Sequence, residues 1–225
     1  VLPEVVKGKD LKRSFDGLSK IPIGIFEKNL KVCIYNFEKD FVNLITARDL
    51  ETASQFTYNI LEEIETSKEL NVSIFDAERN NINNKTNIVE EYMTFVSNVD
   101  KNFNNKKCLC VIIGVNKFIS KFENRLDFYN TLKALEEKGN IRMIFAESVL
   151  KFKGYEYEEW FKNYISKDNA IWVGNGITNQ YLITINSNIR KLDNTCGESF
   201  GYIIKQGYAE LVKLLGMKDV GDENE

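Results

Sequence analysis

The sequence predicts an α/β domain in which a mainly parallel sheet is covered by helices on both faces. Short β-branched runs alternate with longer amphipathic stretches, and this alternation is typical of parallel strands joined by helices. The run 108–115 is almost unbroken in its apolar character, as expected for a strand in the middle of such a sheet. A length of 225 residues with 43% hydrophobic and 12% aromatic residues is enough to fill a sizeable core. We expect one domain over residues 1–218 and an acidic, frayed tail over 219–225.

Hydrophobic periodicity and turn residues predict the individual elements. Apolar residues recurring every three or four positions predict helices at 50–66 and 88–103, and a longer stripe predicts one from 118 to the stop signal at Gly139. A short aromatic stripe predicts a further helix that faces the core, with the members Tyr157, Trp160, Phe161 and Tyr164. The first two strands and the last two are expected to form hairpins, the latter around Gly207. The predicted strands are 21–25, 31–37, 41–46, 71–77, 108–115, 141–146, 170–173, 200–204 and 208–214.

Composition excludes several classes of function. The chain contains no histidine, so a Ser-His-Asp or Cys-His nucleophile and a histidine-ligated metal are ruled out within it. A net charge of -3 has the wrong sign for a domain that holds nucleic acid. No apolar run reaches the roughly 18 to 20 residues of a membrane helix, and no signal peptide opens the sequence. Because the chain begins at Val1, we expect it to be part of a longer polypeptide.

The four cysteines are interpreted as reduced thiols of the core. Three of them, Cys33, Cys108 and Cys110, lie in apolar, strand-like runs, and the fourth is Cys196. A Cys-Leu-Cys pair on a strand points both thiols to one face with no second pair nearby, which disfavours a zinc site. We therefore expect no metal and no disulfide.

A nucleotide in a sheet of this kind would bind at the first strand-turn-helix, which is the stretch 46–53. This stretch has the length and context of a phosphate-binding G-x-x-x-x-G-K-[ST] motif, but every diagnostic residue is replaced. Thr46 and Glu51 stand where glycines would let the backbone wrap a phosphate. Thr52 replaces the lysine, and Ala53 lacks the hydroxyl that would ligate Mg²⁺.

The charges of this turn also disfavour phosphate. Asp49 is a natural N-cap, and Glu51 lies in the first turn of the helix, so two carboxylates use the positive end of the helix. Arg48 is the base nearby, and we expect it to form an ion pair with these acids rather than to clamp a nucleotide.

The end of the predicted central strand supports the same interpretation independently. A strand that organises Mg²⁺ in this architecture ends in one or two acidic residues, whereas this strand ends in Gly114, Val115 and Asn116. The sequence therefore predicts no productive ATP hydrolysis and no cofactor in this domain. Asp76, at the end of the strand 71–77, is interpreted as a structural cap.

Five groups of segments carry a family resemblance. They are IPIGI at 21–25 with the strand at 32–37, SIFDA at 73–77, MIFAE at 143–147, IWVGNG at 171–176, and FGYII at 200–204 with AELVKL at 209–214. In this order and spacing they resemble FtsK/SpoIIIE-type RecA-like ATPases. The resemblance covers nearly the whole chain and points to the C-terminal, third ATPase domain of the coupling proteins of type VIIb secretion systems.

The resemblance implies a RecA-like P-loop NTPase fold in a cytoplasmic domain of a membrane-anchored protein, with ATP and Mg²⁺ in further ATPase domains upstream. It implies as partners secreted WxG-type effector proteins, the neighbouring ATPase domains and other secretion-system components. Terminal domains of this type often carry altered nucleotide sites. Catalytic roles are therefore not carried over to the departing positions, which are Thr46, Glu51, Thr52, Ala53 and Gly114.

A related terminal domain would bind the helical C-terminal signal of its substrate through apolar anchors in a groove. Phe152 and Tyr155 flank Gly154 outside the aromatic stripe, and Trp172 and Asn175 lie at the expected ligand edge of the sheet. These four are the candidate substrate contacts. The plainer interpretation, that the aromatic residues of this region belong to the core, also stands.

The expected function is that of a degenerate, non-hydrolysing ATPase domain that binds or regulates the export of small helical WxG-type substrates. Two alternatives remain. One is a secretion motor that binds ATP at a non-standard site, and the other is a DNA translocase, which the acidic balance and the missing lysine disfavour.

Overall fold

A nine-stranded sheet organises the part of the chain that the computed structural model describes, which is residues 1–11, 17–65, 70–79, 87–103, 106–189, 192 and 196–219. Its order is β2-β1-β9-β8-β7-β3-β6-β5-β4. The strands are β1 (Ile21–Phe26), β2 (Val32–Tyr35), β3 (Val42–Ala47), β4 (Asn71–Asp76), β5 (Cys108–Ile113), β6 (Ile141–Ser148), β7 (Ala170–Val173), β8 (Phe200–Lys205) and β9 (Tyr208–Leu214). The helices are α1 (Leu50–Glu65), α2 (Ile88–Phe103), α3 (Val115–Ser120), α4 (Arg125–Glu137), α5 (Val149–Lys153) and α6 (Glu159–Tyr164), with 3-10 turns η1 (Gly8–Leu11) and η3 (Ile177–Asn179).

Five neighbouring strands, from β7 through β3, β6 and β5 to β4, run parallel. Their carboxyl ends therefore meet at one edge of the sheet, where ligands bind in folds of this class. The predicted hairpins β1-β2 and β8-β9 are confirmed, and both add antiparallel strands beside β7. The mixed α/β class is confirmed.

The strand β5 is not in the middle of the sheet, contrary to the prediction for 108–115. It lies next to the edge strand β4, because the two hairpins extend the sheet on the opposite side. Its six residues are nevertheless all buried, since helices cover both of its faces. An unbroken apolar run indicates that both faces of a strand are covered. It does not indicate how far the strand lies from the edge of the sheet.

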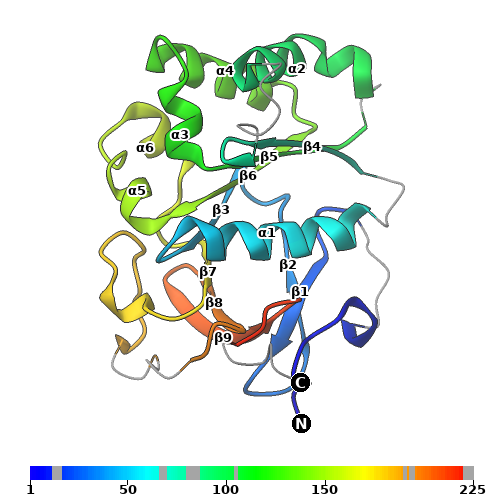
Figure 1. Cartoon of the computed structure of the whole chain (residues 1–225), viewed down its shortest axis with the longest axis vertical. Coiled ribbons are helices and arrows are strands. Elements are labelled where there is room, and N and C mark those ends of the chain that lie inside the picture. Colours follow the sequence, from blue (N-terminus) through cyan, green and yellow to red (C-terminus); the bar gives the residue numbers. More distant parts are fainter. Residues whose placement is uncertain are drawn as a thin grey trace.

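Helices cover both faces of the sheet, as the sequence predicts (Figure 1). The helix α1 packs on one face through Ala53, Phe56, Ile60 and Ile64, all of which are buried. The helices α2, α3, α4 and α6 pack on the other face, where their aromatic side chains form one cluster. Each face thus has its own apolar core.

Two helical stripes differ from the prediction. The stretch from 118 to Gly139 is not one helix but α3 and α4, because Asn124 accepts a hydrogen bond from the N–H of Leu126 and starts a new helix. Leu126 is consequently 55% exposed. Tyr157 precedes α6 instead of joining it, and it is 80% exposed, so the prediction that it faces the core is wrong. Gly139 does end the helix, with a left-handed φ of 74°.

The two ends of the described chain meet beside α1. Val6 forms a β-bridge with Leu215, and the N–H of Gly216 donates to the carbonyl of Val6. Asp219, the first residue of the predicted tail, accepts hydrogen bonds from the N–H and the hydroxyl of Ser199, and residues 220–225 lie outside the described residues. Among the described helices, none has the length and apolar character needed to cross a membrane.

Candidate functional site

The connection between β3 and α1 consists of two residues, Arg48 and Asp49. Thr46 is not part of a loop, because it lies buried inside β3, where its hydroxyl donates to the carbonyl of Glu147 at 2.8 Å. Positions 50 to 53 already belong to α1. The stretch 46–53 therefore matches the phosphate-binding motif in length but does not form a loop of that length.

The N-terminus of α1 is capped by its own chain. The N–H of Thr52 donates to Oδ1 of Asp49 at 2.8 Å, which confirms Asp49 as the predicted N-cap. Glu51 is exposed in the first turn, and Ala53 is fully buried against the sheet. One of the backbone donors that an anion would need is thus already used by a carboxylate.

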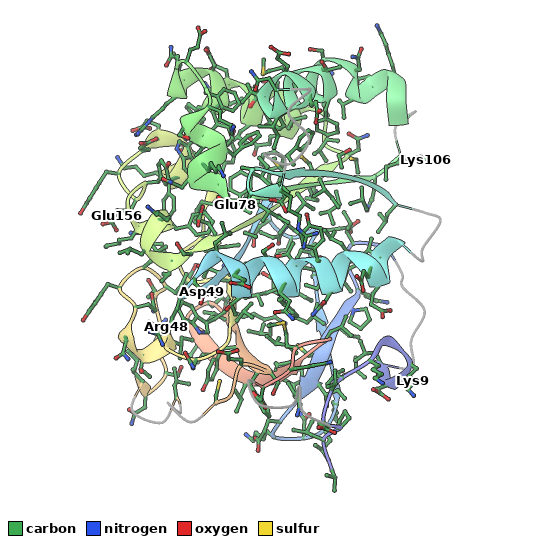
Figure 2. The ribbon with its side chains drawn as sticks, in the orientation of Figure 1. Lys9, Arg48, Asp49, Glu78, Lys106 and Glu156 are labelled. Carbon is green, nitrogen blue, oxygen red and sulfur yellow. The ribbon has the colours of Figure 1, made fainter. Side chains whose placement is uncertain are left out.

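Arg48 does not form the expected ion pair. Its Nη1 donates to Oδ1 of Asn175 at 3.3 Å, and among the described residues it makes no ion pair with Asp49 or Glu51. Figure 2 shows Arg48 and Asp49 together at the N-terminal end of α1. The side chain of Arg48 lies against Gly176, which leaves it directed along the loop after β7 rather than toward the acids.

A hollow of about 220 Å³ lies at this turn. Its lining residues are Arg48, Asp49, Thr52, Val173, Gly174, Asn175 and Glu198. Pockets for drug-sized ligands have volumes of about 300–1,000 Å³, so this hollow lies below that range.

A buried carboxylate, which the sequence reasoning missed, lies at the same edge. Glu147 is the penultimate residue of β6 and is 2% exposed. Its Oε2 accepts the N–H of Asn116 at 2.9 Å, and its Oε1 accepts the N–H of Ser148 at 2.8 Å. Burial raises the pKa of this carboxyl. The available signal was an acidic residue directly after the apolar run of a parallel strand.

The residues after β5 support this carboxylate. Gly114 adopts a left-handed φ of 74°, and its N–H donates to the carbonyl of Ala146. Asn116 receives the hydroxyl of Tyr155 on its Oδ1 at 2.9 Å. The prediction that no carboxylate follows β5 holds for β5 itself, but the neighbouring strand supplies one to the same place.

The residues of this edge make internal contacts where a phosphate would bind in this class of fold. The turn consists of two residues, Asp49 accepts the N–H of Thr52, and the Glu147 carboxylate accepts two backbone donors. Within the described residues no group of three or more Cys, Asp or Glu side chains is arranged to hold a metal ion.

The fold matches that of solved secretion ATPases. The cytoplasmic domain of EssC superposes with a TM-score of 0.71 at 16% identity, over 96% of this chain and 47% of that chain. The chain has the fold of an EssC ATPase domain. EssC ATPases 2 and 3 from Geobacillus thermodenitrificans match with a TM-score of 0.67 at 15% identity, over 96% of this chain and 45% of theirs.

A third similar structure contains a peptide. It is Thermomonospora curvata EccC (ATPases 2 and 3) in complex with a signal sequence peptide, with a TM-score of 0.63 at 14% identity, over 96% of this chain and 44% of that chain. The present chain thus spans about half the length of these EssC and EccC chains. By sequence, neither a family model nor a curated protein matches.

In this EssC-like fold the four candidate substrate contacts differ in their exposure to solvent. Phe152, Tyr155 and Trp172 lie in the core, and the indole N–H of Trp172 donates to the carbonyls of Gly174 and Asn175. Asn175 is half-buried at the rim of the hollow next to Arg48. Spacing alone did not show that the chain folds back between α5 and α6, which buries Tyr155 and exposes its neighbour Tyr157.

Proposed function

We propose that this chain is a degenerate, non-hydrolysing ATPase-like domain of a type VII secretion coupling protein, and that it binds or regulates the export of small helical WxG-type substrates. The observation that carries this proposal is the occupation of the nucleotide edge by the chain's own carboxylates. Asp49 accepts the N–H of Thr52, and Glu147 accepts those of Asn116 and Ser148. A γ-phosphate would compete with these internal acceptors and would be repelled by their charge.

The similar structures support the proposed partners. EssC and EccC ATPases 2 and 3 lie in one chain, and the EccC structure holds a signal sequence peptide. We therefore assign to this domain a secreted substrate, the neighbouring ATPase domains and other secretion components as partners, with the domain in the cytoplasm and its parent protein anchored in the membrane. ATP and Mg²⁺ act in the upstream domains.

We place the substrate contact at the rim formed by Asn175 and Arg48, which are joined by a hydrogen bond of 3.3 Å. Trp172 supports this rim from below, because its indole N–H fixes the backbone of Gly174 and Asn175. Phe152 and Tyr155 are also buried in the core, so we assign them a supporting role and not a direct contact with the substrate. The amide of Asn175 offers both a donor and an acceptor to a peptide backbone.

Calorimetric titration with Mg²⁺-ATP tests the proposed absence of hydrolysis, because a nucleotide that does not bind cannot be hydrolysed. We expect no binding at concentrations on the order of 1 mM, which corresponds to less than about 4 kcal/mol of binding free energy. Asp49→Asn, which keeps the cap and removes the charge, is expected to behave identically. Micromolar binding with phosphate release would refute the proposal.

A second function is favoured by the similarity to domains that are named ATPases. A motor that binds ATP at a non-standard site would give that micromolar binding. A DNA translocase would in addition shift a DNA duplex in a salt-dependent manner.

The substrate contact is tested separately, with a peptide that carries the C-terminal helical signal of a WxG-type protein. We expect Asn175→Ala with Arg48→Ala to weaken its binding about tenfold, because both lose hydrogen-bonding side chains at the rim. The matched control is Asn163→Ala with Lys162→Ala on α6, away from the rim, which should leave binding unchanged. Equal binding by both double variants would contradict this placement.

A further inference from the structure

A second hollow of about 610 Å³ lies between the outward face of α1 and the loop after β4. It shares no lining residue with the hollow at the turn. Its lining residues are Leu50, Glu51, Ser54, Gln55, Tyr58, Asn59, Glu62, Asp76, Glu78 and Arg79. We refer to these residues as the α1 groove.

Carboxylates dominate the charge of the α1 groove, which has four of them and a single guanidinium in its described lining. Two carboxylates have partners. Asp76 accepts the hydroxyl of Tyr58 at 2.6 Å and the N–H groups that follow it, and Glu78 pairs with Lys117 at 3.1 Å. Glu51 and Glu62 are exposed, and within the described part of the chain neither is in an ion pair. The two remaining carboxylates are open to solvent and offer negative charge to a cationic partner.

One guanidinium of the chain already lies in the groove. The guanidinium of Arg79 lies 4.0 Å from the centroid of the Tyr58 ring, and its Nε is 3.7 Å from Oδ2 of Asp76. An aromatic face beside a carboxylate is a standard environment for a guanidinium. The Arg79 side chain is 67% exposed, so a neighbouring molecule can reach this notch from solvent.

The two unpaired acids lie at opposite ends of the groove. Glu51 and Glu62 are eleven residues apart on α1, which places them on one face, about three turns or ~16 Å from each other. Tyr58 and Leu50 supply apolar surface along the same face. We propose that the α1 groove docks a basic helix of a partner protein. Two Arg or Lys side chains eleven residues apart pair with Glu51 and Glu62, and an apolar side chain between them packs against Tyr58.

This proposal goes beyond the proposed function and does not depend on it, because Glu51, the residue of the stretch 46–53 that it uses, makes none of the hydrogen bonds that carry the proposed function. The probe is an Ala/Gln-based helical peptide of about 17 residues with two arginines eleven positions apart and one leucine between them. Titration of the 225-residue chain, followed by amide chemical shifts, is expected to move the signals of 50–62 and 76–79. A peptide with glutamine at both arginine positions is expected to bind at least about tenfold more weakly.

Matched variants separate specific docking from general charge attraction. Glu51→Lys with Glu62→Lys is expected to weaken binding about tenfold. The control, Glu91→Lys with Glu137→Lys, makes the same charge change at exposed positions in the first turn of α2 and the last turn of α4, and should leave binding unchanged. Arg79→Gln removes the guanidinium that lies over the Tyr58 ring, against which the apolar side chain of the peptide packs, and should tighten binding about threefold, which an unfolded variant would not do.

Several outcomes would overturn the proposal. These are the absence of shifts in the groove, equal weakening by the control pair, equal binding of the glutamine peptide, or weaker binding by Arg79→Gln. Shifts of the same size with spermidine alone would assign the groove to a free polyamine and not to a protein segment. The Mg²⁺-ATP titration bears on none of these results, so failure of one proposal leaves the other intact.

Discussion

Glu147 and Asn116 join two parallel strands at their carboxyl ends. Oε2 of Glu147 accepts the N–H of Asn116 at 2.9 Å, so the end of β6 holds the beginning of α3, which follows β5. The hydroxyl of Tyr155 donates to Oδ1 of the same asparagine at 2.9 Å. One buried carboxylate thereby connects the carboxyl ends of β5 and β6 with the segment after α5.

Glu147 is expected to make stability depend on pH. Burial raises the pKa of its carboxyl, so the folded state binds the proton more tightly than the unfolded state does. The resulting contribution to stability is fully present at low pH and is lost as the pH rises through the folded-state pKa. Urea unfolding should be measured at several values from about pH 4 to pH 7. The free energy of unfolding is expected to fall with rising pH more steeply in the wild type than in Glu147→Gln, because glutamine does not titrate. Identical pH profiles would contradict this expectation.

Asp49 is expected to act as a helix cap and as nothing more. Asp49→Ala removes the acceptor of the Thr52 N–H and should lower the free energy of unfolding by about 1 kcal/mol. Asp49→Asn keeps an acceptor and should cost only a few tenths of that amount. Chemical denaturation measures both. A loss with Asn as large as the loss with Ala would show that the charge, not the cap, provides the stability.

Phe118 is at the centre of the aromatic cluster on the α2 face. It is fully buried, and its ring centroid lies 5.1 to 6.4 Å from those of Phe75, Tyr92, Phe122 and Phe128. Phe118→Ala should destabilise the fold by about 3–5 kcal/mol, because it leaves a cavity among these rings. The control Leu126→Ala, at a residue 55% exposed, should stay within about 0.5 kcal/mol of the wild type. Similar losses for both variants would contradict the assignment of Phe118 to the core.

Glu156 is expected to stay ionised to unusually low pH. Hydrogen bonds from Lys153 at 2.8 Å and Lys167 at 3.0 Å lower the pKa of its carboxyl to about 2. Its contribution to stability is present above the ordinary carboxyl pKa and is lost as the pH falls toward 2. Carboxyl ¹³C titration of the wild type measures this value, and Lys167→Met should raise it. An unchanged value in that variant would show that Lys167 has no influence.

Elements with a complete local signal were predictable from the sequence. The face of α1 that carries Phe56 and Ile60 follows from residue spacing, and the cap at Asp49 follows from residue type and position. Side chains in short connections were not predictable. Tyr157 fits a helical stripe by spacing, but the chain turns at 154–157 before α6 begins, so that residue points to solvent. Periodicity carries information only where the backbone is already regular.

The sequence by itself determined the α/β class, the strand segments, the helices α1 and α2 and the two hairpins, because each depends on residues close together in the chain. Only the tertiary structure decided that Glu147 lies beside Asn116, that Arg48 binds Asn175, and that Tyr58 and Arg79 stack in the α1 groove. These contacts depend on strand order, which places β6 between β3 and β5. Strand order is set by the packing of the whole core and not by any local pattern.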